Sequence, residues 1–341
     1  MRTPSNVLIS RTDSLGDVVL TLPMAALLKQ YYPEITIGFI GTSYTKTIIE
    51  SCQYIDYFID KEDFLNQDIT LGGEQPQCLI HVLPKIEMAK RARDLQIPLR
   101  IGTTNRWYHW TTCNKLVKLG RNRSPLHEAQ LNLKLLKPFA IPTDFSLPEV
   151  ANLIDLSRLP KQPNTQYANL LQPEKFKLIL HPKSRGSARE WSLDHYIELV
   201  KLLDPNKYQI FISGTANEKT DLQPLFEAVA DRVTDITGTM SLAEFITFVA
   251  ACDGLVACST GPLHIAAALK KHAIGIYQPM RPIHPGRWQP IGKNVKVFVL
   301  NKICNDCRLD KINCACTQAI QPMEIKNYLE SISTNTMPLK S

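Results

Sequence analysis

The sequence predicts an α/β protein with two Rossmann-like domains, each built on a doubly wound parallel sheet. Three observations support this prediction: short apolar runs alternate with helical patterns in the first half, the alternation restarts in the second half, and a proline-rich stretch separates them. A length of 341 residues suits two domains better than one. Strands that alternate with helices indicate parallel sheets covered on both faces.

In the first half we expect strands at 6–10, 35–40, 57–59, 77–83 and 99–102. Helical patterns lie between or after them, at 18–31, 85–95 and 128–137. Pro23 falls inside the first of these patterns, so that helix either begins near Pro23 or kinks there. Prolines then recur from 142 to 173 among polar residues with weak periodicity. We interpret residues 141–173 as the connection between the domains.

The second half predicts strands at 176–180, 208–213, 233–236, 254–258, 273–277 and 295–300, with helices at 193–203, after Gly214, at 242–251 and from about Leu263. The expected division is an N-terminal domain at 1–165, a C-terminal domain at 166–320, and a helix with a polar tail at 321–341. Two such domains would face each other across a cleft between the carboxyl ends of their sheets, where open α/β sheets bind ligands.

The composition indicates an ordinary globular protein with a moderate basic excess. Hydrophobic residues make up 44% and charged residues 21%, and the formal net charge is +7. That charge fits an anionic small ligand, a phosphorylated lipid surface or nucleic acid, and a generic basic surface fits equally well. No apolar stretch approaches the ~20 residues that span a bilayer, and no secretory signal is visible. We therefore expect a cytoplasmic protein that can contact a membrane face.

Three loops between a strand and a helix are candidates for chemistry. The first contains Asp17, which could cap the following helix or accept a proton from an attacking hydroxyl, and the local pattern favours the cap. The second, residues 181–191, combines hydroxyls, a glycine and three cations, which suits a diphosphate better than a solvated loop. The third, residues 259–264, offers hydroxyls and amides to the same anion, with His264 as a supporting ligand.

Several other classes lack their signatures. No G-x-G-x-x-G follows a strand, which argues against a nicotinamide-dependent dehydrogenase, and no G-x-x-x-x-G-K-[ST] supports P-loop phosphoryl transfer. No H-x-x-x-H or D-x-D cluster indicates a catalytic metal. A leaving diphosphate would therefore be stabilised by Arg189, hydroxyls and helix dipoles.

The three loops together resemble the heptosyltransferase family, glycosyltransferase family 9. The resemblance covers the stretch from Val7 to Pro23, the Arg-Glu-Trp element at 189–191, the Ser-Thr-Gly-Pro-Leu-His block at 259–264, and the segments 279–282 and 284–288. These matches span most of the chain in the family's order. The resemblance implies a GT-B fold and an inverting, metal-independent sugar transfer without a cofactor.

The resemblance also implies roles for individual residues. It makes Asp17 the catalytic base, which outweighs the capping interpretation, and it puts Arg189 at the family's phosphate-binding lysine, where a guanidinium can grip phosphate in a bidentate way. The implied nucleotide-sugar site comprises Ser184, Arg189, Glu218, Met240, Ser259, Thr260, Gly261 and His264. Some family members have an aspartate in place of Ser259, and this departure bears on how the donor sugar is held.

The family's substrates are the implied partners, with ADP-heptose as donor, a lipopolysaccharide-core or related glycolipid as acceptor, and no nucleic acid. Basic residues that could meet an anionic acceptor are Lys85, Lys90, Arg91, Arg93, Arg100, Arg106, Arg121 and Arg123. Two alternatives remain open: a GT-B transferase with another nucleotide sugar, and a non-catalytic nucleotide-sugar-binding protein of the same fold.

Four of the nine cysteines cluster near the C-terminus, at Cys304, Cys307, Cys314 and Cys316. A structural zinc site usually shows two C-x2-C-like pairs, whereas the second pair here is separated by one residue. This is a weak metal candidate, and reduced cysteines in a loop are the favoured interpretation. A redox- or zinc-regulated interaction protein is a third alternative that depends only on this cluster.

Overall fold

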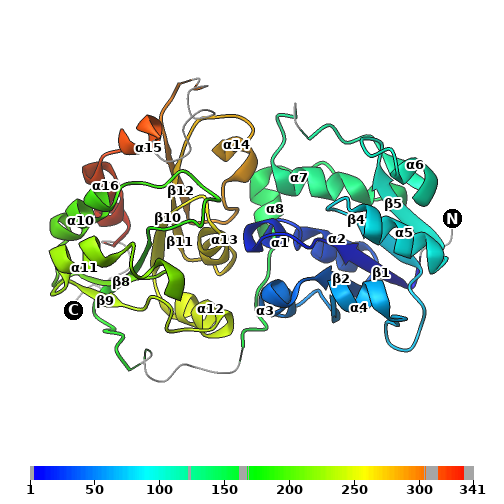
Figure 1. Cartoon of the computed structure of the whole chain (residues 1–341), viewed down its shortest axis with the longest axis horizontal. Coiled ribbons are helices and arrows are strands. Elements are labelled where there is room, and N and C mark those ends of the chain that lie inside the picture. Colours follow the sequence, from blue (N-terminus) through cyan, green and yellow to red (C-terminus); the bar gives the residue numbers. More distant parts are fainter. Residues whose placement is uncertain are drawn as a thin grey trace. The chain divides into compact units, whose positions relative to one another are not determined.

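The computed structural model describes residues 4–121, 124–160, 167, 169–302, 304 and 314–333. The chain divides into two compact units (Figure 1). Unit 1 comprises Met1–Leu159 with Ile291–Lys293, and unit 2 comprises Pro160–Pro290 with Asn294–Ser341. The division thus falls between Leu159 and Pro160, where the sequence suggested a boundary near 165.

Unit 1 is built on a parallel six-stranded sheet with the order β3-β2-β1-β4-β5-β6. The strands are β1 (Asn6–Ser10), β2 (Thr36–Gly41), β3 (Tyr57–Asp60), β4 (Cys78–His81), β5 (Leu99–Thr103) and β6 (Lys115–Val117). All of β1 and β4 is buried, as expected for central strands covered on both faces. The short edge strand β6 was missed in the sequence, because three residues with one lysine give no clear apolar run.

The helices of unit 1 are short, and several were not predicted. They are α1 (Leu15–Val19), α2 (Pro23–Tyr31), η1 (Ser43–Thr45), α3 (Lys46–Glu50), α4 (Lys61–Asn66), α5 (Ile86–Asp94), α6 (His109–Thr112), α7 (Glu128–Leu133), η2 (Lys134–Phe139) and α8 (Leu147–Asn152). Pro23 begins α2, which settles the question of start or kink in favour of a start. The helix expected at 128–137 is α7 followed by the 3₁₀ helix η2, which contains Pro138.

The stretch interpreted as the connection between domains is more structured than predicted. It contains helix α8. Ser146 and Glu149 form a capping box at the start of this helix, and Pro148 lies in its first turn. The backbone of Asp155 then accepts a hydrogen bond from Gln53, and Arg158 donates to the carbonyl of Ile55 at 2.8 Å. These contacts tie residues up to 158 to unit 1, which explains why the division follows Leu159.

Unit 2 repeats the architecture with a parallel sheet of order β12-β11-β10-β7-β8-β9. Its strands are β7 (Phe176–His181), β8 (Tyr208–Ile212), β9 (Val233–Asp235), β10 (Gly254–Cys258), β11 (His272–Tyr277) and β12 (Val295–Val299). Its helices are α10 (Leu193–Leu202), η3 (Ala216–Glu218), α11 (Gln223–Val229), α12 (Leu242–Ala251), α13 (Gly261–Ala268), α14 (Pro285–Trp288), α15 (Ala315–Gln318) and α16 (Pro322–Ser333).

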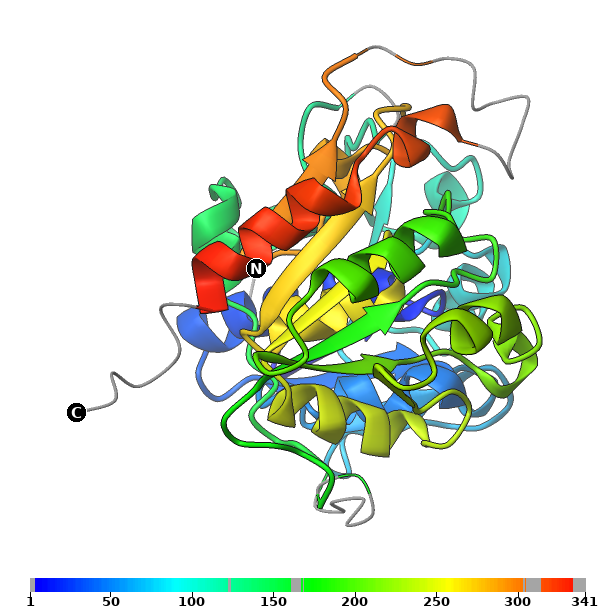
Figure 2. The same ribbon diagram turned by 90° about the vertical axis from the view of Figure 1, so that its left-hand side faces the viewer.

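The C-terminal helix α16 belongs to the core of unit 2. Ile325 and Leu329 pack in the same apolar cluster as strands β7 and β8, and α16 lies alongside α10 over the sheet (Figure 2). The indole of the buried Trp191 donates to the carbonyl of Ile320 at 2.9 Å. No helix within the described ranges is long and apolar enough to cross a membrane.

The buried histidine His81 gives unit 1 a pH-sensitive stability. Burial, with smaller contributions from His109 and Arg100, lowers the pKa of His81 from 6.5 to about 3. His81 is therefore neutral when folded but titrates near 6.5 when unfolded, so acidification through pH 6.5 stabilises the unfolded state. We expect this residue alone to cost about 2 kcal/mol of folding free energy at pH 5. Urea unfolding at pH 7 and pH 5 should show the loss, and His81→Gln should flatten the pH dependence.

Candidate active site

The first candidate site lies where the strand order of unit 1 reverses. Strands β1 and β4 are neighbours, but the chain continues from β1 towards β2 and from β4 towards β5, so the loops after β1 and β4 diverge at this point. Such switch points at the carboxyl ends of strands are where doubly wound sheets bind ligands. The loop after β1 leads directly to Asp17 in α1.

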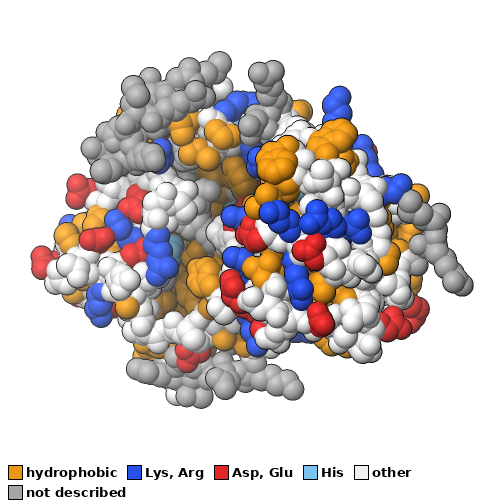
Figure 3. Space-filling model, turned by 45° about the vertical axis from the view of Figure 1, so that its right-hand side comes forward, with side chains coloured by type: hydrophobic (Ala, Val, Ile, Leu, Met, Phe, Trp, Pro, Cys, Tyr) orange, Lys and Arg blue, Asp and Glu red, His pale blue; other side chains and the backbone are white. Residues whose placement is uncertain are grey.

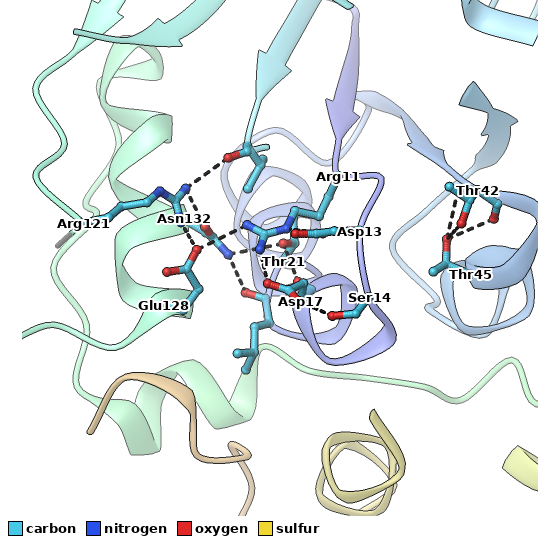
Figure 4. Close-up of polar contacts among 12 residues, drawn as sticks. Arg11, Asp13, Ser14, Asp17, Thr21, Thr42, Thr45, Arg121, Glu128 and Asn132 are labelled. Atoms are coloured by element: carbon cyan, nitrogen blue, oxygen red, sulfur yellow. Dashed lines mark hydrogen bonds and ion pairs between the residues drawn. The ribbon is translucent and has the colours of Figure 1, made fainter. Parts of the chain in front are cut away.

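Asp17 is the third residue of α1 and is not its N-cap. Ser14 occupies the cap position with extended backbone, and its hydroxyl bonds Oδ2 of Asp17. The other carboxylate oxygen, Oδ1, accepts a hydrogen bond from Nη2 of Arg11 (Figure 4). The side chain of Asp17 is 17% exposed, so solvent and a substrate can still reach it. Asp17 therefore does not cap α1, and both oxygens of its carboxylate are held by hydrogen bonds.

Arg11 holds three carboxylates at once. Its Nε donates to Asp13 at 2.7 Å and its Nη1 to Glu128 at 3.3 Å, while Nη2 pairs with Asp17. Burial, opposed by Arg11 and reinforced by the charge of Asp17, raises the pKa of Asp13 above its usual value. Asp13 and Asp17 therefore share one guanidinium as their ion-pair partner.

A second arginine, Arg121, contacts the carboxylate of Glu128 and so extends this network. Arg121 pairs with Glu128, and its Nη2 donates to the carbonyl of Val82 at 3.1 Å and to Asn132 at 3.2 Å. Asn132 in turn donates to the carbonyl of Leu20 at 3.1 Å, at the end of the helix that contains Asp17. The network joins the loop after β1, the loop after β4 and helix α7 (Figure 4).

The network has an excess of negative charge. With every group ionised, three carboxylates face two guanidinium groups, and the side chains of Arg11 and Glu128 are only 4% and 1% exposed. The arrangement fixes the orientation of the Asp17 carboxylate, whose two oxygens are held by Arg11 and Ser14. Sequence reasoning found Asp17 but missed Arg11 and Glu128, which lie 117 positions apart.

The second candidate site lies at the corresponding switch point of unit 2, between β7 and β10. The residues predicted to bind a nucleotide sugar all follow the carboxyl ends of strands in this sheet. Ser184 and Arg189 follow β7, Glu218 follows β8, Met240 follows β9, and Ser259, Thr260, Gly261 and His264 follow β10. Because β9, β8, β7 and β10 are consecutive in the sheet, the topology gathers all eight along one edge.

The loop after β7 is shaped by Glu190, which sequence reasoning passed over. One oxygen of its carboxylate accepts from the backbone N–H of Ser184 at 2.8 Å and lies 2.9 Å from the Ser184 hydroxyl, while the other pairs with Lys183 at 2.7 Å. Arg185 and Gly186 both have positive φ angles, 51° and 76°, which fold the loop tightly. Ser184 thus has a structural role whether or not it contacts a ligand.

Buried polar groups of the same edge are suited to an anion. Arg189 is buried although it carries a permanent charge. Thr260 is the N-cap of α13 but makes no side-chain cap bond, and its buried hydroxyl has no hydrogen-bond partner among the described residues. The first-turn N–H groups of α13, with Gly261 first and the buried His264 in the same turn, provide a helix N-terminus that attracts negative charge.

The other residues predicted to contact the nucleotide sugar are Glu218, Met240 and Ser259. The carboxylate of Glu218 accepts from the N–H and hydroxyl of Thr215, at 2.7 and 2.9 Å, in the capping box of η3. Met240 is half-buried just before α12. Ser259 is half-buried and hydrogen-bonds Tyr277, which moderates the rise that burial causes in the pKa of that phenol.

The C-terminal cysteines form an apolar cluster in the described part of unit 2. Cys304, Cys314 and Cys316 are buried against Met280, while Cys307 lies outside the described residues. Burial is the main cause that raises the pKa of Cys316 to about 11, so its thiol stays protonated at neutral pH. Among the described side chains no group of three His, Cys, Asp or Glu is placed to hold a metal ion.

Seven of the eight basic residues suggested for an acceptor lie in the described part of the chain and separate into two sets. Arg91 pairs with Asp68, Arg93 with Asp94 and Arg121 with Glu128, and Arg100 donates to the carbonyl of Thr112 at 2.7 Å. Lys85, Lys90 and Arg106 are exposed and form no ion pair with a described residue. Arg123 lies outside the described residues. Only the second set offers its charge freely to a ligand.

Two doubly wound parallel-sheet units joined in one chain are the architecture of the GT-B fold. Known structures share this fold across nearly the whole chain. The crystal structure of a glycosyltransferase of family 9 from Veillonella parvula covers 98% of this chain and 99% of its own, with a TM-score of 0.80 and 16% identity. That of ADP-heptose lipopolysaccharide heptosyltransferase II from Escherichia coli covers 97% and 99%, with a TM-score of 0.73 and 18% identity.

The sequence assigns the family. The profile of glycosyltransferase family 9 (heptosyltransferase) matches residues 81–316, and the chain belongs to this family. It is therefore a glycosyltransferase. A putative glycosyltransferase of Haemophilus influenzae is 29% identical over 297 residues, which are 84% of this chain and 86% of that protein. Lipopolysaccharide heptosyltransferase 2 of Escherichia coli is 29% identical over 101 residues, 28% of this chain and 29% of the relative.

Proposed function

We propose that this glycosyltransferase transfers heptose from ADP-heptose to a lipopolysaccharide-core or related glycolipid, with inversion and with Asp17 as general base. The observation that supports this most is the fixed carboxylate of Asp17, bonded at both oxygens and placed at the switch point of unit 1. A positioned carboxylate of this kind is what deprotonation of a sugar hydroxyl requires.

The proposed donor site is the carboxyl edge of the unit 2 sheet. There the buried guanidinium of Arg189, the Thr260 hydroxyl and the N-terminus of α13 would receive the diphosphate. ADP-heptose is proposed because structures of related proteins are those of an ADP-heptose lipopolysaccharide heptosyltransferase and of an Escherichia coli heptosyltransferase with ADP-2-deoxy-2-fluoro heptose. Met240 would contact the base, and Ser259 and Glu218 would contribute polar contacts.

The proposed reaction is a single displacement. The acceptor hydroxyl loses its proton to Asp17 as its oxygen attacks the anomeric carbon, and the bond from that carbon to the diphosphate oxygen breaks on the opposite face. Arg11 keeps Asp17 oriented throughout, and Glu128 keeps Arg11 in place. The charge that develops on the diphosphate is stabilised by Arg189 and the α13 dipole, so the proposal needs no metal ion.

The acceptor is proposed to be an anionic, phosphorylated glycolipid presented at the cytoplasmic face of the inner membrane. The basic excess of the chain, +7, and the unpaired cations of unit 1 support an anionic acceptor. The protein would then act as a peripheral enzyme on lipid-anchored substrate.

A donor panel tests the proposed function. The purified chain would be given ADP-heptose, UDP-sugars or GDP-sugars with a heptose-deficient lipopolysaccharide acceptor, and products would be identified by mass spectrometry. Heptosylated product with ADP-heptose alone is the expected result. Transfer from a UDP- or GDP-sugar would identify another member of the GT-B class, and the absence of transfer from every donor would favour a non-catalytic protein.

Replacement of Arg189 should weaken donor binding strongly. A charge-assisted hydrogen bond to phosphate contributes about 1.5–3 kcal/mol, so Arg189→Ala should raise the Kd for ADP roughly 10- to 100-fold. Isothermal titration calorimetry measures this directly, and Arg189→Lys should recover part of the loss. Arg185→Ala, in the same loop but exposed, is the matched control and should stay within about twofold. Unchanged ADP affinity in Arg189→Ala would show that the guanidinium serves the fold alone.

A further inference from the structure

The carboxyl edge of the unit 1 sheet carries exposed tryptophans. Trp107 is 74% exposed and Trp110 is 64% exposed, more than any other large hydrophobic side chain among the described residues. Both follow the carboxyl end of β5, in the loop and short helix α6 that lead towards β6. Indoles are large apolar groups, so two of them in solvent mark an interaction surface.

The loop that carries the two indoles is anchored to the sheet by a buried side chain, while the indoles themselves are exposed. His109, between the two tryptophans, is fully buried, and its Nδ1 accepts from the backbone N–H of Thr103 at 2.9 Å. A Cβ at Gly102 would lie 2.6 Å from that nitrogen, so glycine in β5 is what lets His109 pack there. The indole N–H of Trp110 donates to the carbonyl of Thr104 at 3.2 Å, which leaves the apolar face of the ring for a partner.

Unpaired cations accompany the tryptophans along this edge. Lys85 follows β4, Arg106 follows β5 and Lys118 follows β6, and these strands are consecutive in the sheet. All three side chains are exposed and form no ion pair within the described part of the chain. We call the set of Lys85, Arg106, Trp107, Trp110 and Lys118 the rim surface.

The charge of the protein is concentrated in this region. Residues 85–121 contain nine Lys and Arg but two Asp and Glu, a net charge of +7 that equals the formal net charge of the whole chain. On the face of unit 1 drawn in Figure 3, Lys and Arg side chains lie beside exposed apolar side chains. Indoles together with unpaired cations suit a partner that has an anionic surface layer over an apolar interior.

We propose that the rim surface docks on the surface of an anionic lipid bilayer. The indoles of Trp107 and Trp110 lie at the headgroup level, where amphipathic rings are favoured, and the three cations lie against lipid phosphates. A protein partner would need a defined pocket for the indoles, whereas a bilayer accepts two protruding rings without one. The chain has no membrane-spanning helix among its described residues, so contact at the interface is the available mode.

Docking at the rim surface would bring the enzyme to a lipid-anchored acceptor, and this role of the docking rests on the proposed function. The carboxyl ends of β1 and β5 lie on the same edge of the sheet, two strand spacings or ~10 Å apart. Asp17 follows β1, so a bilayer that contacts the rim surface brings the headgroup of a glycolipid acceptor towards the proposed base.

Vesicle binding by the full chain, without donor or acceptor, tests the inference. In co-sedimentation the protein should bind vesicles of phosphatidylcholine with phosphatidylglycerol at least ~10-fold better than phosphatidylcholine alone, and added salt should weaken binding. Trp107→Ala with Trp110→Ala should reduce binding ~10-fold or more. Lys85→Gln, Arg106→Gln and Lys118→Gln together should remove the preference for anionic lipid.

The matched control replaces two exposed tyrosines of unit 1 that precede or begin strands and so lie away from the carboxyl edge of the sheet. Tyr31, at the end of α2, and Tyr57, the first residue of β3, are 44% and 42% exposed. Tyr31→Ala with Tyr57→Ala should leave vesicle binding unchanged. Brominated lipid gives a readout that needs no loss of binding: it should quench tryptophan fluorescence of the wild type and not that of Trp107→Phe with Trp110→Phe, which retains Trp191 and Trp288.

The outcomes separate this inference from the proposed function. The docking proposal is overturned if the wild type and the tryptophan variant bind vesicles equally, or if brominated lipid does not quench the fluorescence. It is also overturned if the tryptophans mediate self-association or binding to another protein and the chain has no affinity for lipid. Transfer to a detergent-dispersed acceptor should be unchanged in the tryptophan variant, which also shows that it folds. Vesicle binding without transfer from any donor would leave docking intact and refute the proposed function.

Discussion

Asp17→Asn should reduce kcat for sugar transfer by about 10²- to 10⁴-fold, the range that general base catalysis contributes. The amide keeps the volume and can still contact Arg11 and Ser14, but it cannot accept the proton of the acceptor hydroxyl. Donor binding should change by less than about twofold, because the proposed donor site is in unit 2. Steady-state kinetics and calorimetric titration with ADP would measure the two quantities separately.

Asp13→Asn is the matched control for this prediction. Asp13 pairs with the same guanidinium as Asp17, at 2.7 Å from Nε of Arg11. Its loss removes one negative charge from the same network but leaves both contacts of Asp17, so kcat should fall by less than about tenfold. A loss equal to that of Asp17→Asn would mean that the charge of the cluster matters and that Asp17 has no special role as base.

Glu128→Ala should destabilise unit 1 by about 3–5 kcal/mol, the cost of removing one partner from a buried ion pair. Glu128 lies between Arg11 and Arg121, and its loss removes the buried carboxylate that separates the two guanidinium groups, although Arg11 keeps its pairs with Asp13 and Asp17. Urea unfolding followed by circular dichroism would detect the change. Transfer should also slow, because Arg11 would lose the contact that fixes it beside Asp17.

Two variants calibrate that result. Glu128→Gln keeps the shape and removes the charge, so a loss close to that of the alanine variant would show that the charge is what matters. Glu50→Ala breaks the exposed pair with Lys46, whose atoms lie 3.8 Å apart, and should change stability by no more than about 0.5 kcal/mol. Glu128→Ala with wild-type stability would contradict the role assigned to the network.

The strands were predictable because central parallel strands are continuous apolar runs. Both Asn6–Ser10 and Gly254–Cys258 were found in the sequence with the bounds that the structure shows. The short elements were not: β6 has three residues, and α8 lies in a proline-rich stretch that resembled a linker. In those places capping and tertiary contacts define the element, and periodicity gives little signal.

The candidate sites show the same limit. Loops after strands could be read from hydroxyl, glycine and cation patterns, and Asp17 and Arg189 do follow the carboxyl ends of β1 and β7. The residues that orient them could not be found, because an ion pair between Arg11 and Glu128 depends on how distant segments fold together. Glu190 was overlooked for another reason: it was read as the middle of Arg-Glu-Trp, whereas its carboxylate shapes the loop.

The anomeric configuration of the product tests the central claim most directly. A hydroxyl deprotonated by Asp17 that attacks the anomeric carbon in one step must invert the configuration of the donor sugar. We expect NMR of the product formed from ADP-heptose to show the configuration opposite to that of the donor. Retained configuration would require an intermediate or a front-face reaction and would contradict the single displacement with Asp17 as base.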